Sequence, residues 1–163
     1  MEMIMNYILA IDPSLSNTGL CLFDTIGNPI KTMSIPTTSK QSHGERLKII
    51  ADVLLGLRQQ YPITLIVLES GFSRHAVSTQ VLYRVRGVID YLFYDIPEIC
   101  YAPSSIKKII CGNGRADKSL VQGKILEMFP YMKFENQDQS DSVGIGLCYF
   151  IEKGIISWRN SDA

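Results

Sequence analysis

Apolar residues near the start of the chain fall into three short runs, each with the length of a β-strand. The runs are Tyr7 to Asp12, Leu20 to Asp24 and Ile30 to Ile35. Gly27-Asn28-Pro29 lies between the second and third runs and is typical of a tight turn. For strands this close in sequence, the simplest arrangement is an antiparallel meander.

An amphipathic helix and a fully apolar strand follow. Ser42 and Glu45 have the spacing of a capping box, which predicts that a helix begins there. Apolar residues then recur at helical intervals up to Tyr61-Pro62, at Leu47, Ile50, Leu54 and Leu57. The next run, Ile63 to Leu68, is continuously apolar and indicates a strand buried on both faces.

The second half of the chain alternates helical and extended patterns. A helical period from Ser73 to about Tyr94 rests on Val77, Val81, Val85, Val88 and Leu92. A short fifth strand is expected at Glu98 to Ala102. Three further helices are predicted at Ser104 to Ile110, Lys118 to Met128 and Asp138 to Glu152. This alternation predicts an α/β fold in a single domain over residues 1–163, with a short polar tail at 159–163.

Length and composition support that interpretation. A chain of 163 residues with 46% hydrophobic content can bury a sizeable core in one domain. No apolar run approaches the roughly 20 residues needed to span a bilayer, and Met1 to Asn6 lacks the basic start of a signal peptide. We therefore expect a cytoplasmic protein that does not associate with membranes.

The cysteines do not form a metal-binding pattern. There is no CxxC pair, and the further soft ligands are His43 and His75. We expect buried, reduced thiols rather than zinc ligands at Cys21, Cys100, Cys111 and Cys148.

The net charge is zero and the pI is about 6.7, which taken alone argues against a nucleic-acid partner. The basic residues are nevertheless clustered. One stretch without acids holds Arg74, Arg84 and Arg86. A second, with Asp117 as its one acid, holds Lys107, Lys108, Arg115, Lys118 and Lys124. Either stretch could be an ordinary solvated helix face or a phosphate-binding surface.

Two carboxylates stand at the ends of predicted strands, and two more stand at the start of a predicted helix. Asp12 ends the first strand and is followed by Pro13, while Glu69 ends the apolar strand. Asp138 and Asp141 are three residues apart, hence on the same face of the first turn of the last helix. Their ordinary roles would be an Asp-Pro turn and a helix cap.

The alternative is that the four carboxylates converge. Clustered carboxylate oxygens are the ligands preferred by Mg²⁺ or Mn²⁺. Two such ions about 4 Å apart catalyse phosphodiester hydrolysis in many nucleases.

Four segments together resemble a known family. They are LAIDPSLSNTG, IVLESGF, APSSIKKIICGNGRADKSLVQ and DQSDSVGIGL, in the family's order and spacing. The chain resembles the RuvC-type Holliday junction resolvases of the RNase H-like superfamily. The resemblance implies a five-stranded mixed sheet, with three antiparallel then two parallel strands, flanked by helices. It also implies an endonuclease that resolves four-way and related branched DNA junctions by paired, metal-dependent hydrolysis.

The resemblance also implies roles for individual residues. Two Mg²⁺ ions, which Mn²⁺ would replace, are held by Asp12, Glu69, Asp138 and Asp141. Lys107 and Lys118 engage the scissile region, and Phe72 sits at the junction centre or in the core. Further DNA contacts are expected from Arg74, Arg84, Arg86, Lys108, Arg115 and Lys124. A homodimer is expected, with its interface on the helix Val77 to Leu92.

Ser14 stands where bacterial members commonly have glycine, and the chain ends soon after the last helix. These features resemble the bacteriophage branch of the family, which would place the protein in the host bacterial cytoplasm. Two other functions are possible: a junction-binding protein that has lost cleavage, and an actin-like or sugar-kinase phosphate-binding domain. The four carboxylates disfavour the first, and the chain is too short for the second domain of such kinases.

Overall fold

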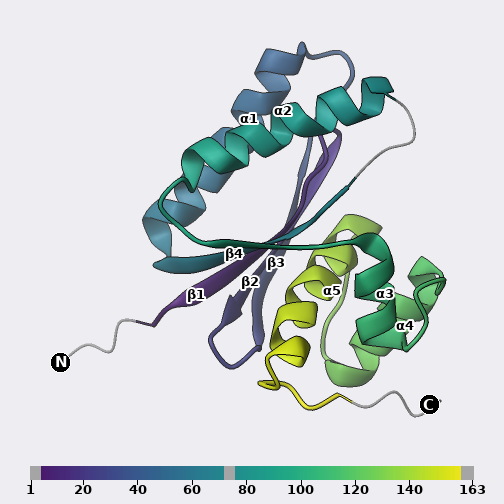
Figure 1. Ribbon diagram of the computed structural model, residues 1–163. Coiled ribbons are helices and arrows are strands. Elements are labelled where there is room, and N and C mark those ends of the chain that lie inside the picture. The colour runs from purple at the N-terminus through teal and green to yellow at the C-terminus, as the bar shows by residue number, and fades with distance from the viewer. Residues whose placement is uncertain (1–4, 72–75, 159–163) are drawn as a thin grey trace.

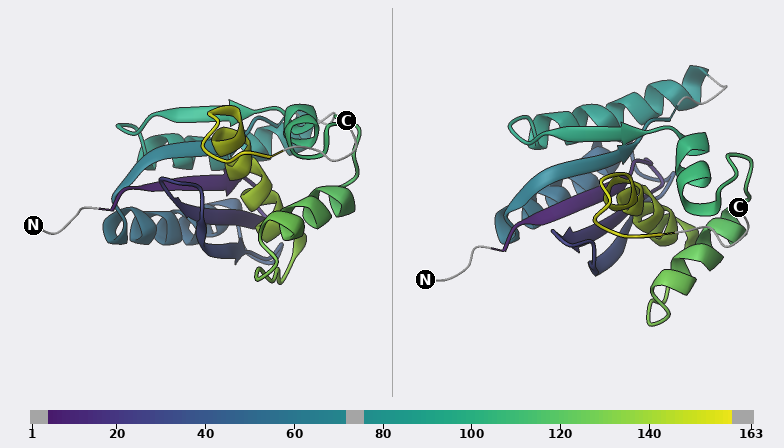
Figure 2. Two further views of the ribbon diagram at one scale, coloured as in Figure 1. Left: turned by 90° about the horizontal axis from the view of Figure 1, so that it is seen from below. Right: turned by 60° about the horizontal axis from the view of Figure 1, so that its bottom comes forward.

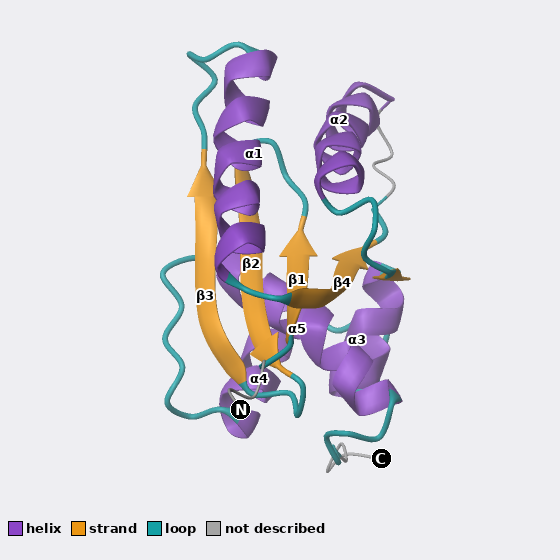
Figure 3. Ribbon diagram, turned by 90° about the vertical axis from the view of Figure 1, so that its left-hand side faces the viewer, coloured by secondary structure: helices purple, strands orange, loops and turns teal. Residues whose placement is uncertain are grey.

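The computed structural model describes residues 5–71 and 76–158. Its strands form one five-stranded sheet in the order β3-β2-β1-β4-β5 (Figure 3). Their bounds are Tyr7–Asp12 (β1), Asn17–Asp24 (β2), Pro29–Pro36 (β3), Ile63–Glu69 (β4) and Glu98–Tyr101 (β5). β1, β2 and β3 pair antiparallel, β4 is parallel to β1, and β5 is parallel to β4. The predicted mixed sheet is confirmed.

Helices cover both faces of this sheet (Figure 1). They are α1 (His43–Gln60), α2 (Ala76–Leu92), α3 (Pro103–Cys111), α4 (Lys118–Met128) and α5 (Gln137–Glu152). α1 and α2 lie on one face, and α5 with α3 and α4 lies on the other, as the second view in Figure 2 also shows. In the described part of the chain, no helix is long and apolar enough to cross a membrane.

The central strand β1 supplies both layers of the core. Ile8 and Ala10 pack with α3, α4 and α5, whereas Leu9 and Ile11 pack with α1 and α2. Successive side chains of a strand point to opposite faces, so a strand covered on both faces must be apolar throughout. For this reason β1 is buried without alternation along its four middle residues, Ile8 to Ile11.

The helix α5 approaches the sheet unusually closely at Gly146. A Cβ added to Gly146 would lie 2.7 Å from Cζ of Phe23 and 3.0 Å from Cβ of Ala10. Glycine is therefore required by the space between helix and strands. This close contact sets how deeply α5 lies on the sheet, and so where its first turn lies.

Two predicted boundaries are wrong in ways that affect the site. β2 begins at Asn17, not at Leu20, because its first residues pair with the last residues of β3 and β1. α5 is capped by Asn136, whose side chain accepts a hydrogen bond from the backbone N–H of Gln139. Asp138 is therefore inside the first turn and is not the cap. By contrast, the capping box of Ser42 and Glu45 is confirmed.

The prediction of buried thiols is wrong for Cys100. Cys21 and Cys148 are buried and Cys111 is half-buried, and all four cysteines are free. Cys100 is exposed because it lies on β5, at the edge of the sheet. Its Sγ lies 3.6 Å from Nη1 of Arg86 and 3.5 Å from Oε1 of Glu98.

We predict that Gly146→Ala destabilises the protein by about 1–3 kcal/mol, because the added methyl group must displace Phe23 or shift α5. Gly56→Ala is the matched control, since it lies on the exposed side of α1 with nothing within 4 Å of the added Cβ. This control should gain roughly 0.5–1 kcal/mol from helix propensity. Urea unfolding of both variants measures the difference, and equal stabilities would contradict the close packing.

Candidate active site

Two of the four carboxylates reach the same edge of the sheet because their strands are parallel. In the β1–β4 register, Ile11 pairs with Leu68, the residue before Glu69. Asp12 and Glu69 each follow one member of this last pair, so both lie at the carboxyl ends of adjacent strands. Such ends are where parallel sheets place their functional groups.

The other two carboxylates are brought in by α5. Gly19 pairs with Asp12 across β1 and β2. A Cβ added to Gly19 would lie 2.7 Å from the backbone carbon of Asp138. The start of α5 therefore rests directly on the strand position opposite Asp12. Asn136 fixes the same helix end to β3, because its Nδ2 donates to Ser34 Oγ at 2.8 Å.

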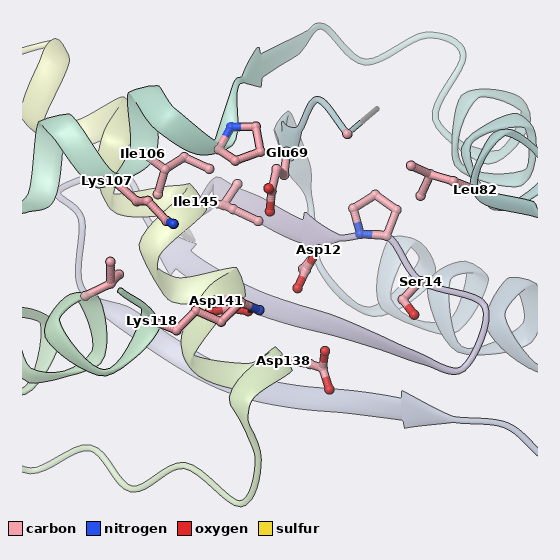
Figure 4. Close-up of a pocket in the computed structure, with 14 residues that line it drawn as sticks. Asp12, Ser14, Glu69, Leu82, Ile106, Lys107, Lys118, Asp138, Asp141 and Ile145 are labelled. Carbon is pink, nitrogen blue, oxygen red and sulfur yellow. Dashed lines mark hydrogen bonds and ion pairs between the residues drawn. The ribbon is translucent and has the colours of Figure 1, made fainter. Parts of the chain in front are cut away.

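All four carboxylates line one pocket of about 400 Å³ (Figure 4). Lys107 of α3 and Lys118 of α4 line it as well. The pocket is completed by apolar side chains, among them Ile106 and Ile145. The six residues assigned from the sequence to the catalytic site thus lie together, although their elements are far apart in the chain.

The carboxylates oppose one another's ionisation. Burial raises the pKa of Asp12 from 3.8 to about 8, with smaller contributions from the charges of Glu69, Asp141 and Asp138. Burial also raises the pKa of Glu69, and the nearby charge of Asp141 adds to this effect. A pocket that disfavours the ionised form of its own acids favours a bound cation.

Asp141 and Asp138 are each held by a different kind of donor. Lys118 Nζ lies 2.6 Å from Oδ2 of Asp141, and Gln137 Nε2 donates to its Oδ1 at 2.9 Å. Asn17 Nδ2 donates to Oδ2 of Asp138 at 2.6 Å. Asp141 is thus paired with an ammonium group, whereas Asp138 is oriented by a neutral amide.

The donor set fits a hard divalent cation. Its oxygens come from four carboxylates, the ligand type that Mg²⁺ and Mn²⁺ prefer. Among the described residues, no three His, Cys, Asp or Glu side chains already form a group that could hold a metal ion. A cation would compete with Lys118 for Asp141, so binding requires the side chains to adjust.

The predicted DNA contacts differ in their surroundings. Lys108 and Arg115 are exposed. Arg84 is exposed too, and its Nη1 lies 2.7 Å from Nδ1 of His43. Arg86 is engaged by Glu98 at 2.5 Å and by Asp90 at 3.6 Å.

The structure argues against Lys124 as a DNA contact. Only 7% of this residue is exposed, and its Nζ pairs with Glu127 at 3.3 Å. Its position on the inner side of α4 removes it from the basic surface expected from the sequence. Phe72 and Arg74 lie outside the described residues.

Asn17 and Gly19 are parts of the site that the sequence did not reveal, because the predicted second strand began at Leu20 and left both residues outside it. The structure shows why both belong to it. Cys21 and Phe23 face α5, and a strand repeats its facing every second residue. Extending that period backwards places Gly19 and Asn17 on the face that meets α5.

A comparison with protein families decides the relationship. The family described as "Crossover junction endodeoxyribonuclease RuvC" matches residues 8–149. The chain belongs to the RuvC family. This membership replaces the actin-like or sugar-kinase interpretation.

Individual RuvC proteins agree. The Ehrlichia ruminantium (strain Gardel) RuvC is 32% identical over 152 residues, covering 87% of this chain and 94% of that protein. The Rhizobium etli RuvC is 27% identical over 153 residues, covering 90% of each. These relatives are bacterial and similar in length to this chain. They therefore give no support to the bacteriophage branch expected from the short sequence.

Solved structures share the fold. Thermus thermophilus RuvC in complex with a Holliday junction substrate superposes with a TM-score of 0.80 at 17% identity, covering 91% of this chain and 94% of that one. The yeast mitochondrial Holliday junction resolvase has a TM-score of 0.62 at 13% identity, with 94% and 84% covered. At these identities the likeness establishes the RNase H-like fold of the chain.

We predict that metal-free wild-type protein loses stability relative to Asp12→Asn as the pH rises from 5 to 8. In this range folded Asp12 keeps a proton that the unfolded chain has released, so raising the pH favours unfolding. The difference should grow by up to about 1.4 kcal/mol per pH unit. Asp12 is a better position for this test than Asp138 or Asp141, whose bonds to Asn17 and Lys118 a substitution would also change.

Urea unfolding in EDTA at several pH values measures this difference. Asp52→Asn is the control, because Asp52 is exposed on α1 and does not line the pocket. Parallel curves for wild type and Asp12→Asn would show that burial does not raise the pKa of Asp12.

Proposed function

We propose that the protein is a structure-selective endonuclease that resolves four-way and related branched DNA junctions by paired phosphodiester hydrolysis. The observation that carries this proposal is the convergence of Asp12, Glu69, Asp138 and Asp141 in one pocket of a RuvC-family chain. The relatives are named as crossover junction endodeoxyribonucleases, and the Thermus protein has been solved with a Holliday junction. A protein that only bound junctions would not need four carboxylates at the cost of their mutual repulsion.

Mg²⁺ is the proposed cofactor, with Mn²⁺ as a substitute, and the four carboxylates are the proposed ligands. When bound, two such ions would supply the charge that activates water and stabilises the attacked phosphate. The chain's own residues would position the two ions. Asp12 and Glu69 come from strand ends, while Asp138 and Asp141 come from a capped helix start, so the backbone positions of the ligands are set by the fold and only their side chains adjust to the ions.

Lys107 and Lys118 are proposed to bind the scissile phosphate. Both line the pocket, and 65% of the Lys118 side chain is exposed although its Nζ contacts Asp141. An ammonium group near the phosphate would stabilise the negative charge that develops on its oxygens during hydrolysis. Lys108 and Arg115, which are exposed outside the pocket, would add to electrostatic attraction of DNA.

We predict that Asp12→Asn and Glu69→Gln each lower junction cleavage in Mg²⁺ by at least about 100-fold, while changing junction affinity less than about 3-fold. Each change removes a proposed metal ligand and leaves the basic residues in place. The measurement compares cleavage and binding of a synthetic four-way junction with those of a linear duplex of the same sequence. Asp52→Asn is the control, as an exposed aspartate on α1. Full cleavage by either pocket variant would overturn the site, and equal cleavage of duplex and junction would overturn the selectivity.

The protein is further proposed to act as a homodimer, because resolving a junction takes two paired nicks and a twofold enzyme matches that substrate. The proposed interface is α2. This helix exposes large apolar side chains, with Val77 73%, Tyr83 55% and Tyr91 79% exposed. Several large exposed apolar side chains on one helix favour an interaction surface.

We predict that Tyr91→Asp shifts the protein from dimer to monomer in sedimentation velocity at micromolar concentration. If α2 is the interface, dimer formation would bury the new carboxylate without a partner of opposite charge, which disfavours the dimer. Tyr131→Asp is the matched control, because Tyr131 is 67% exposed and lies outside α2. A monomeric wild type that resolves junctions would contradict the dimer.

A further inference from the structure

A second cleft, of about 390 Å³, adjoins the carboxylate pocket. Its walls are the β1–β2 turn, the first turns of α1 and the first turns of α2. Both hollows are lined by Pro13, Ser14 and Leu82, so these residues form their common border. In Figure 4, Ser14 and Leu82 lie on the opposite side of Asp12 from Lys107 and Lys118.

An arginine is fixed in the wall of this cleft. Arg46 Nε donates to Thr37 Oγ1 at 2.8 Å. The backbone N–H of Thr37 donates in turn to the carbonyl of Ser16 at 2.9 Å. Arg46 is therefore tied to the β1–β2 turn through one of its five N–H donors. A guanidinium held in this way loses little side-chain entropy when it binds an anion.

The first residue of α1 adds a second donor. His43 Nδ1 lies 2.7 Å from Nη1 of Arg84. Arginine can only donate, so Nδ1 must accept and the ring proton of a neutral His43 is on Nε2. The acid closest in sequence, Glu45, is engaged in the capping box, with its carboxylate 2.6 Å from the backbone N of Ser42.

The two hollows thus have opposite chemistry. The first contains four carboxylates, whereas the described residues lining the second include no acid. The second offers hydroxyl, imidazole and guanidinium donors from Ser14, Ser16, His43 and Arg46, beside an apolar wall formed by Val81 and Leu82. Donors next to an apolar wall suit a chain that alternates phosphate with sugar and base. Because the two hollows share a border, one extended strand could occupy both.

We propose that this second cleft binds the phosphodiester backbone of the cleaved strand, on the side of the scissile phosphate away from Lys107 and Lys118. The inference rests on the proposed nuclease function and adds to it a path for the strand. The strand would cross the carboxylates between two groups of donors, one formed by Lys107 and Lys118 and the other by the Arg46 guanidinium and the neutral His43 ring. A strand held on both sides of the cut cannot tilt away from the carboxylates.

The test uses Arg46→Gln against Lys48→Gln. Both changes remove one positive charge from α1, but Lys48 pairs with Asp52 on the solvent side and lies outside the cleft. Junction affinity is measured over a range of KCl concentrations in Ca²⁺. Arg46→Gln should weaken binding about 5- to 20-fold and reduce the slope of log K against log salt by about 0.7–0.9, the value of one lost phosphate contact. Lys48→Gln should change affinity less than about 2-fold.

Neutral methylphosphonate linkages then locate the contact. They are placed singly at each phosphate on both sides of the cleavage site. The wild-type protein should lose affinity when the neutral linkage stands at one or two positions on one side of the cleavage site. The Arg46→Gln variant should lose no further affinity from a neutral linkage at those same positions. Arg46→Lys, which keeps the charge and should fold as wild type does, is expected to restore most of the affinity and the wild-type pattern.

Equal losses of junction affinity in Arg46→Gln and Lys48→Gln would overturn the cleft assignment. The assignment would also fail if, at every position, the affinity lost through the neutral linkage added to the affinity lost through Arg46→Gln. If one of these results is found while the wild-type protein still cleaves the junction, only the cleft assignment fails and the proposed function stands. If wild type neither binds nor cleaves the junction, the proposed function fails with it.

Discussion

Four carboxylates that repel one another are held within one partly buried pocket, and the rest of the fold supplies the restraint. Parallel pairing of β1 and β4 fixes Asp12 beside Glu69. Gly19 lets the start of α5 rest on β2, directly opposite Asp12. Because strand register and helix packing are set by the apolar core, the acids cannot separate to relieve their repulsion. Burial raises the pKa of Asp12 to about 8, and the neighbouring acids, which cannot move away, add to this shift.

The two acids of α5, Asp138 and Asp141, are held in place by different donors, and these donors affect cation binding differently. Lys118 holds Asp141 but would compete with a cation for it, whereas the neutral amide of Asn17 orients Asp138 without bringing a competing charge. The other amide atom, Oδ1 of Asn17, is buried and has no hydrogen-bond partner among the described residues. Asn17 therefore leaves its Oδ1 without a hydrogen bond while its Nδ2 orients Asp138. Stability is commonly lost in this way at functional positions.

Much of this architecture could be predicted because the apolar pattern and the chemistry coincide. The apolar runs of β1 and β4 identified the strands, and an acid at the end of each indicated a shared edge. The start of β2 could not be predicted from propensity, because polar residues such as Asn17 form a strand there only through pairing with neighbouring strands. Lys124 was misplaced because its burial depends on which side of α4 meets the core, and the charge pattern does not reveal this.

The central claim is that the carboxylates form one electrostatically coupled cluster, and carbon-detected NMR titration of the Asp12 side chain tests it most directly. In metal-free protein the Asp12 carboxyl should titrate with a pKa of about 8. Glu69→Gln should lower that value, because it removes the largest contribution from a neighbouring charge. Excess Mg²⁺ should remove the transition from this pH range. An Asp12 carboxyl that titrates near its ordinary value in both proteins, unaffected by Mg²⁺, would contradict the account.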